Sequence, residues 1–170
     1  MNQPKLYLFV GYPGSGKTTV AKLIADKTGA VHLWADHERL QMFGSPKHTH
    51  EESRQLYDHL NQVTDGLLAA GKSVVFDTNF NFYKDREHLR QIAARRGGET
   101  VVVWITTPKD IAKKRAVEDR NLRNGYEFPM PDESFERIVN NLEPPREDEK
   151  IIKIDGAKLD ETQAIEQLSL

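Results

Sequence analysis

The sequence predicts an α/β fold, with a five-stranded parallel sheet covered by helices on both faces, in one domain that spans residues 1–170. Two observations support this prediction. Short apolar runs alternate along the chain with longer stretches of helical periodicity, and this alternation is typical of parallel strands joined by crossover helices. In addition, no repeat, low-complexity stretch or long linker divides the chain, whose 170 residues suit a single core.

Five apolar runs predict the strands: Leu6–Val10, Val31–Ala35, Ser73–Phe76, Thr100–Thr106 and Ile151–Ile154. Six stretches with helical spacing predict the helices: Lys17–Lys27, Glu51–Ala70, Lys84–Arg96, Asp110–Arg123, Asp132–Leu142 and Glu161–Leu168. Asp132 is expected to cap the helix that follows it. Ligands bind beyond the carboxyl ends of the strands in such a sheet, so the residues after each strand are the candidates for a functional site.

The first predicted strand runs directly into a phosphate-binding sequence, G-Y-P-G-S-G-K-T at residues 11–18, which matches the pattern G-x-x-x-x-G-K-[ST]. Its glycines let backbone N–H groups surround a phosphate, and the N-terminus of the next helix adds partial positive charge. Lys17 can reach the β- and γ-phosphates, and the Thr18 hydroxyl can bind Mg²⁺. The residues expected to hold ATP are Gly11, Pro13, Gly14, Ser15, Gly16, Lys17, Thr18 and Thr19. The alternative is a glycine-rich turn that only precedes a helix.

Two aspartates follow predicted strands. Asp77 comes directly after Val74–Phe76, and a carboxylate in this position serves Mg²⁺ in phosphate-loop proteins; the alternative is a turn residue at a strand end. Asp36 follows the second strand, where it can accept a proton from a hydroxyl that attacks the γ-phosphate; the alternative is the cap of a helix that begins at His37. Arg39 lies one helical turn further on and can bind a phosphate of the acceptor or pair with Asp36.

An arginine-rich segment after the fourth strand is predicted to form a lid at roughly residues 115–131. A helix that carries Arg115 is followed by a break at Gly125 and a second helix, which is typical of a mobile lid. Arg120 and Arg123 are the expected catalytic arginines, because guanidinium groups can stabilise the charge spread over a transferring phosphoryl group. The alternative is a solvated helix whose arginines pair with neighbouring acidic residues.

The composition limits the classes of function. The formal net charge is −2, so no overall positive field attracts nucleic acid, and any nucleic-acid contact must use a local patch. The chain contains no cysteine, which excludes disulfides, thiolate chemistry and cysteine-bound zinc. The first apolar run is too short for a signal peptide or a membrane span, so we expect a cytoplasmic protein with no membrane partner and no obligate protein partner.

Residues 6–142 together resemble the phage-type polynucleotide 5′-kinases and their relatives among the small phosphate-loop kinases. Four pieces carry the resemblance. They are the phosphate loop with Pro13 before its second glycine, the D-x-x-R sequence Asp36–Arg39, the D-T-N-x-N sequence at 77–81, and the R-N-L-R-N-G sequence at 120–125, which is similar to the lid of that family.

The resemblance implies a phosphate-loop NTPase three-layer sandwich with strand order 2-3-1-4-5 and a helical lid. It also implies roles for single residues: a general base at Asp36, an acceptor contact at Arg39, ordering of the acceptor and the metal shell by Asp77 and Asn79, and transition-state stabilisation by Arg120 or Arg123. One position departs from the family pattern, because Asn124 stands where the family usually has an arginine.

These patterns together predict a kinase that uses ATP and Mg²⁺ to phosphorylate a hydroxyl group. The expected acceptor is the 5′-hydroxyl of an RNA or DNA end. A small molecule, such as a sugar, a nucleotide-sugar or a drug with a hydroxyl group, is the alternative acceptor. A protein that binds or hydrolyses ATP without a phosphate acceptor is the third reading.

Overall fold

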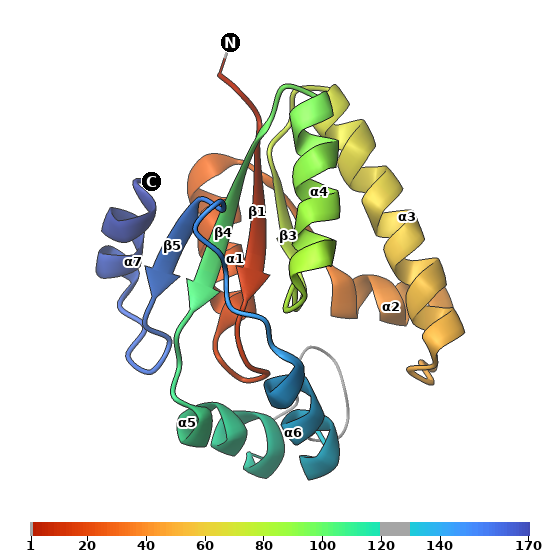
Figure 1. Ribbon diagram of the computed structural model, residues 1–170, viewed down its shortest axis with the longest axis vertical. Helices are drawn as coiled ribbons and strands as arrows, with labels where there is room; N and C mark the ends of the chain where they lie inside the picture. The colour runs from red at the N-terminus through yellow and green to blue at the C-terminus, as the bar shows by residue number, and fades with distance from the viewer. Residues whose placement is uncertain (1, 120–129) are drawn as a thin grey trace.

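A single five-stranded parallel sheet forms the centre of the computed structural model, which describes residues 2–119 and 130–170 (Figure 1). Its strands are β1 (Lys5–Val10), β2 (Val31–Trp34), β3 (Val74–Asp77), β4 (Glu99–Ile105) and β5 (Ile151–Ile154). The strand order is β2-β3-β1-β4-β5, which confirms the predicted fold and topology. β1 is therefore the central strand, and the phosphate loop leaves the sheet from its middle.

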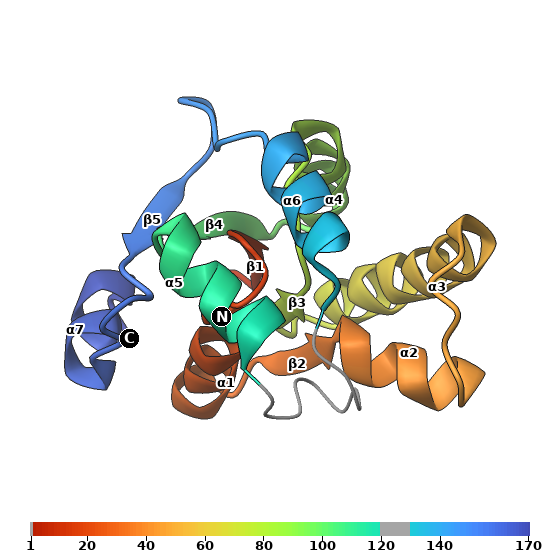
Figure 2. The ribbon, with the colours of Figure 1, turned by 90° about the horizontal axis from the view of Figure 1, so that it is seen from below.

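Helices cover both faces of the sheet, as the view from below shows (Figure 2). α3 and α4 lie on one face, and α1 and α7 lie on the other. The helices on the two faces are α1 (Lys17–Thr28), α3 (His50–Ala69), α4 (Tyr83–Arg95) and α7 (Glu161–Leu168). Beyond the carboxyl ends of the strands lie α2 (Ala35–Phe43), α5 (Lys109–Lys113), the π-helical turn η1 (Lys114–Glu118) and α6 (Asp132–Asn141). Within the described residues, none of the helices combines the length and the apolar character needed to cross a bilayer.

The structure differs from the predicted elements at three places. β2 ends at Trp34, and Ala35 already begins α2, a helix that the sequence indicated only as an alternative role for Asp36. The helix predicted at Asp110–Arg123 is described only as far as Asp119, and its second half is the π-helical turn η1. Asp132 is the first residue of α6, and Pro131 occupies the capping position instead.

The core is built by the alternation of side chains along β1. Leu6 and Leu8 face α3 and α4, whereas Tyr7 and Phe9 face α1 and α7, and none of the four is more than 4% exposed. Burial of each such side chain contributes roughly 1.5–3 kcal/mol of hydrophobic stabilisation. A parallel sheet that is covered on both faces needs apolar residues at every position, which explains why this strand reads as an uninterrupted apolar run.

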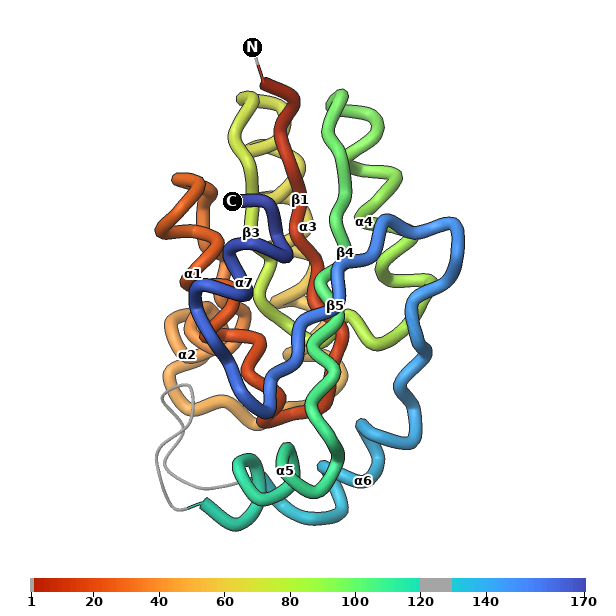
Figure 3. Tube along the Cα trace, turned by 90° about the vertical axis from the view of Figure 1, so that its left-hand side faces the viewer, coloured from red at the N-terminus to blue at the C-terminus, as the bar shows by residue number. Residues whose placement is uncertain are grey.

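α5, η1 and α6 form a further, smaller layer beyond the end of the sheet (Figure 3). The buried side chains of Ala112, Ala116 and Phe135 hold this layer together, and Tyr12 of the phosphate loop packs against them. Lys113 also lies 2.9 Å from a carboxylate oxygen of Asp132 and makes a further ion pair with α6, and these hydrogen bonds raise its pKa. The helices on either side of residues 120–129 are therefore joined to each other and to the phosphate loop.

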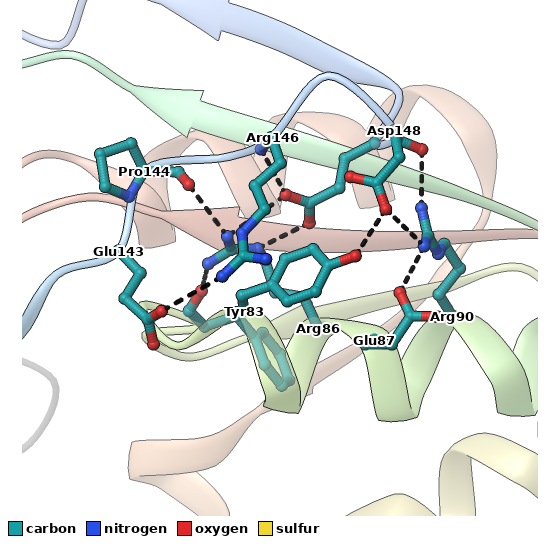
Figure 4. Close-up of polar contacts among 10 residues, drawn as sticks. Tyr83, Arg86, Glu87, Arg90, Glu143, Pro144, Arg146 and Asp148 are labelled. Atoms are coloured by element: carbon teal, nitrogen blue, oxygen red, sulfur yellow. Dashed lines mark hydrogen bonds and ion pairs between the residues drawn. The ribbon is translucent and has the colours of Figure 1, made fainter.

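A buried ion pair fastens the segment after α6 to α4 (Figure 4). The guanidinium of Arg86 is 1% exposed, and its Nε donates a hydrogen bond of 2.7 Å to Glu149. Its other nitrogens donate to the carbonyl oxygens of Phe80 and Pro144, at 2.7 and 3.3 Å. The donors of Arg86 thus join α4 and the Phe80 segment just before it to the segment after α6, whose residues Pro144 and Glu149 lie 58 and 63 positions further along the sequence.

We expect Arg86→Met to lower the free energy of unfolding by about 3–5 kcal/mol, because it leaves the Glu149 carboxylate buried without its cation. Arg90→Met, one turn along the same helix, is the matched control. Arg90 pairs with Asp148 at the surface, so its loss should change stability by about 1 kcal/mol or less. Urea denaturation followed by circular dichroism measures both, and equal losses in the two variants would contradict this account.

Candidate functional site

A cavity of about 1050 Å³ opens at the carboxyl edge of the sheet. Most residues expected to form the site line it: Pro13, Gly14, Gly16, Lys17, Thr18, Thr19, Asp36, Arg39, Asp77 and Asn79. The walls come from the phosphate loop, α2, the segment after β3, η1, α6 and residues near 156–159. The fold therefore brings the candidate nucleotide, metal and acceptor residues of the sequence to one place.

The phosphate loop takes its shape from glycines with left-handed backbone angles. Gly14 has φ 79° and Gly16 has φ 108°, a region in which residues with a side chain are strained. A Cβ atom on Gly14 would also lie 2.4 Å from the carbonyl oxygen of Ala112. Gly16 caps α1, so the N–H groups of the first turn of that helix point toward the cavity, where an anion is stabilised.

Lys17 lies over the phosphate loop. Its Nζ donates hydrogen bonds to the carbonyl oxygens of Tyr12, at 2.8 Å, and Gly11, at 3.3 Å. The ammonium group is therefore held against the loop carbonyls, within the loop that the sequence pattern assigns to the phosphates of a nucleotide.

Two expected residues, Gly11 and Ser15, lie behind the wall of the cavity and do not line it. The carbonyl oxygen of Ser15 accepts a hydrogen bond of 2.7 Å from the hydroxyl of Thr107, which follows β4. Gly156, which follows β5, packs so closely here that a Cβ atom would lie 2.1 Å from the same carbonyl oxygen. The loop is thus supported from behind by residues that come from two other strand ends.

Asp77 ends β3 and is only 4% exposed, yet it reaches the cavity. Its Oδ2 lies 2.9 Å from Nε2 of His32, a neighbour on β2. This contact fixes the orientation of the carboxylate. The Thr18 hydroxyl and the Asp77 carboxylate are oxygen donors in the same cavity, which is the ligand chemistry that Mg²⁺ prefers.

Asp36 lies half-buried in the first turn of α2 and lines the cavity. Arg39, one turn further on, is 7% exposed and lies 2.7 Å from Oε1 of Glu52 on α3. Burial alone would raise the pKa of Glu52, but hydrogen bonds from the Lys47 N–H and from Arg39 outweigh it and lower that pKa. The buried carboxylate of Glu52 therefore compensates the charge of Arg39. The contact of Arg39 with an acceptor phosphate stays a prediction.

Several residues that the sequence did not single out as site residues also line the cavity. The hydroxyl oxygen of Tyr57, on α3, lies 2.7 Å from the hydroxyl oxygen of Thr78, and burial raises the pKa of Tyr57. His48 has φ 55°, which is unusual for a residue other than glycine and marks local strain. Arg137 enters the cavity from α6 together with Ser134. The sequence signal that could have found Arg137 is its place in the helix that follows the predicted lid.

Part of the predicted lid falls outside the described residues. Arg120 and Arg123 belong to this part, so their predicted roles remain predictions. Arg115 is described, and its guanidinium donates hydrogen bonds to the carbonyl oxygens of Gly156, at 2.9 Å, and Ala157, at 3.3 Å. The start of the lid is thus tied to the chain that follows β5.

Comparison with known proteins gives results in keeping with this geometry. The AAA domain family matches residues 6–145. A shikimate kinase of Acinetobacter baylyi is 30% identical over 151 residues, covering 83% of this chain and 76% of its own length. A sugar kinase structure from Janibacter sp. superposes with a TM-score of 0.70 at 24% identity, covering 99% of this chain and 92% of the other. The Mycobacterium tuberculosis APS kinase in complex with AMPPNP and APS has a TM-score of 0.66 at 19% identity, and each chain is covered completely, 100% in both cases.

We expect Gly156→Ala to destabilise the chain and to weaken ATP binding, because the new Cβ would lie 2.0 Å from Thr107 Oγ1 and 2.1 Å from Ser15 O, both of which support the phosphate loop. Overpacking of this kind costs about 1–3 kcal/mol or more. Gly66→Ala, in an exposed part of α3 where a Cβ atom meets nothing within 4 Å, should stabilise the chain by roughly 0.5–1 kcal/mol. Thermal unfolding and ATP titration measure both variants. Unchanged ATP affinity in Gly156→Ala would contradict the supporting role of Gly156.

Proposed function

The chain belongs to the AAA domain family, and we propose that it transfers the γ-phosphoryl group of ATP to a hydroxyl group of a small-molecule acceptor. Its enzyme class is that of the ATP-dependent kinases. The class of the acceptor and the role of each residue are our proposal.

The observation that carries the proposal is that Asp36 shares one cavity with the phosphate loop and Asp77. A protein that only binds or hydrolyses ATP does not need a carboxylate placed to take a proton from an alcohol. A kinase does, because the acceptor oxygen becomes a better nucleophile as its proton is removed. Phosphoryl transfer otherwise depends on positioning and on stabilisation of charge, which the phosphate loop and its lysine provide.

Each residue then has a definite task. The loop amides and Lys17 hold the phosphates, and Asp36 accepts the proton of the attacking hydroxyl. Thr18 and Asp77 would hold Mg²⁺, which neutralises phosphate charge when it is bound. Arg120 or Arg123 remains the proposed arginine of the transition state.

Three arguments favour a small molecule over the polynucleotide 5′-end. The similar proteins reported above are a shikimate kinase, a sugar kinase and an APS kinase, which supports the alternative acceptor given by the sequence better than its first choice. The cavity volume of about 1050 Å³ also lies just above the range of roughly 300–1,000 Å³ found for small-molecule sites, so it suits a nucleotide with one compact acceptor. Glu52 moreover compensates the charge of Arg39, the residue expected to hold an acceptor phosphate.

Incubation with radioactive ATP, Mg²⁺ and a panel of acceptors tests the proposal. The panel contains shikimate, gluconate, adenosine 5′-phosphosulfate, other sugar acids and sugars, and 5′-hydroxyl oligonucleotides of RNA and DNA. We expect label on a small molecule and none on the oligonucleotides, and Lys17→Met should abolish it. Label on an oligonucleotide that weakens steeply with salt would restore the polynucleotide acceptor. Loss of ATP without any labelled acceptor would indicate an ATPase.

We expect Asp36→Asn to lower the rate of phosphoryl transfer on the order of 10²-fold or more, because the amide cannot accept the proton of the acceptor. ATP binding should survive, since the phosphate loop is unchanged. Asp26→Asn, at an exposed position of α1, makes the same substitution outside the cavity and should leave the rate unaltered. Steady-state kinetics and ATP titration distinguish the two effects. Full activity in Asp36→Asn would remove this residue as the base.

A further inference from the structure

Asn81, the last residue of the D-T-N-x-N sequence, has no task in the mechanism above. It is 4% exposed and does not line the cavity. Its side-chain amide binds both the backbone N–H and the backbone carbonyl of Gly11, at the start of the phosphate loop. Oδ1 accepts a hydrogen bond from the Gly11 N–H, and Nδ2 donates one to the Gly11 carbonyl oxygen, each at 3.2 Å.

These two bonds matter because Gly11 is buried. A buried backbone N–H or carbonyl without a partner costs free energy comparable to a lost hydrogen bond. The ladder between β1 and β3 ends before this point, with its last pair at Leu8 and Phe76. The Phe80 N–H then donates to the Phe9 carbonyl, at 2.9 Å, and the Asn81 side chain continues the same edge as far as Gly11. The Asn81 side chain thus supplies the hydrogen bonds to Gly11 that a neighbouring strand would make if the ladder continued.

The segment that carries Asn81 is itself held firmly. Arg86 donates a hydrogen bond of 2.7 Å to the Phe80 carbonyl, and this guanidinium is fixed by the buried carboxylate of Glu149 (Figure 4). The Glu143 N–H, just after α6, donates to the Asn81 carbonyl at 2.7 Å. The side chain of Asn81 is therefore presented to Gly11 from a rigid base.

The Gly11 carbonyl oxygen has a second donor, Nζ of Lys17 at 3.3 Å. Lys17 also donates to Tyr12. Because the lysine of a phosphate loop binds the β- and γ-phosphates, we expect it to give up these backbone contacts when ATP is bound. If Gly11 depended on Lys17 alone, this movement would leave a buried carbonyl oxygen without a donor. The Asn81 amide donates to the same oxygen and does not depend on Lys17 for this bond.

We propose that Asn81 is a positioning residue for ATP: it fixes the Gly11 peptide at the start of the phosphate loop and keeps its carbonyl satisfied when Lys17 moves to the phosphates. This inference rests on the proposed ATP site and not on the identity of the acceptor. Its consequence is that Asn81 acts on nucleotide affinity although it does not touch the nucleotide.

The test is titration of the protein with Mg²⁺ and AMPPNP at a temperature where circular dichroism shows each variant to be folded. Asn81→Ser removes both bonds to Gly11, and we expect it to weaken AMPPNP binding about tenfold, as the loss of one to two hydrogen bonds implies. Asn61→Ser on α3 is the matched control, since Asn61 is half-buried and lies outside the cavity lining. The AMPPNP affinity of Asn61→Ser should equal that of the unmodified chain.

Asn81→Asp separates the two bonds. The carboxylate can still accept from the Gly11 N–H but cannot donate to the carbonyl, and its charge attracts Lys17 away from the phosphates. We expect a loss of affinity at least as large as in Asn81→Ser. Equal AMPPNP affinity in both Asn81 variants and the unmodified chain, even with lower melting temperatures, would overturn the proposal and leave Asn81 a purely structural residue.

A measurement on the unmodified chain covers the case in which neither variant folds. The Gly11 amide should stay protected from hydrogen exchange with and without AMPPNP, because Asn81 holds it in both states. Rapid exchange of this amide in the complex would contradict the proposal. Absence of AMPPNP binding by the unmodified chain would instead contradict both the ATP site and the proposed function.

Discussion

The peptide of Gly11, at the end of the central strand, is the point from which the rest of the site is organised. A side chain would be crowded there, because a Cβ atom would lie 2.8 Å from Ser15 Oγ and 3.0 Å from the Ile105 carbonyl oxygen. The neighbouring strand ends support the loop at two residues: Asn81 after β3 binds Gly11, and Thr107 after β4 and Gly156 after β5 lie against the carbonyl oxygen of Ser15. A parallel sheet makes this possible, since all its strands end at one edge. The phosphate loop thus inherits its rigidity from the sheet.

Charged groups around the cavity are oriented in advance by partners of opposite charge or by hydrogen bonds. Asp77 is held by His32, and Arg39 is held by Glu52 and Ser53. Such preorganisation lets a site stabilise developing charge without rearranging at the moment of reaction. Arg137 differs from these residues, because no hydrogen bond or ion pair to its guanidinium is seen among the described residues. Its position on α6 places a cation on the wall formed by the layer beyond the sheet.

The sequence predicted the sheet and most of the cavity lining for reasons that are local, whereas the strand order followed from the family resemblance. A strand buried on both faces is a continuous apolar run, and the phosphate loop is a contiguous pattern whose glycines have fixed conformational tasks. Asp36 and Asp77 follow from their places at strand ends. The sequence did not predict α2 as a separate element, because its apolar spacing is weak. It offered Asp36 as a partner for Arg39 but not Glu52, and it named no partner for Arg86 or Gly11. Glu52, Glu149 and Asn81 are 13, 63 and 70 positions away from these residues, and only the folded chain brings them together.

The central claim is that one cavity holds the nucleotide on the phosphate loop and the acceptor beside Asp36. A crystal structure of the chain with Mg²⁺ and AMPPNP tests it most directly. The account predicts the γ-phosphate against the loop amides and Lys17, the metal between Thr18 and Asp77, and the Asp36 carboxylate facing open space next to the γ-phosphate. A nucleotide seated elsewhere, or an Asp36 carboxylate turned away from the γ-phosphate, would contradict it.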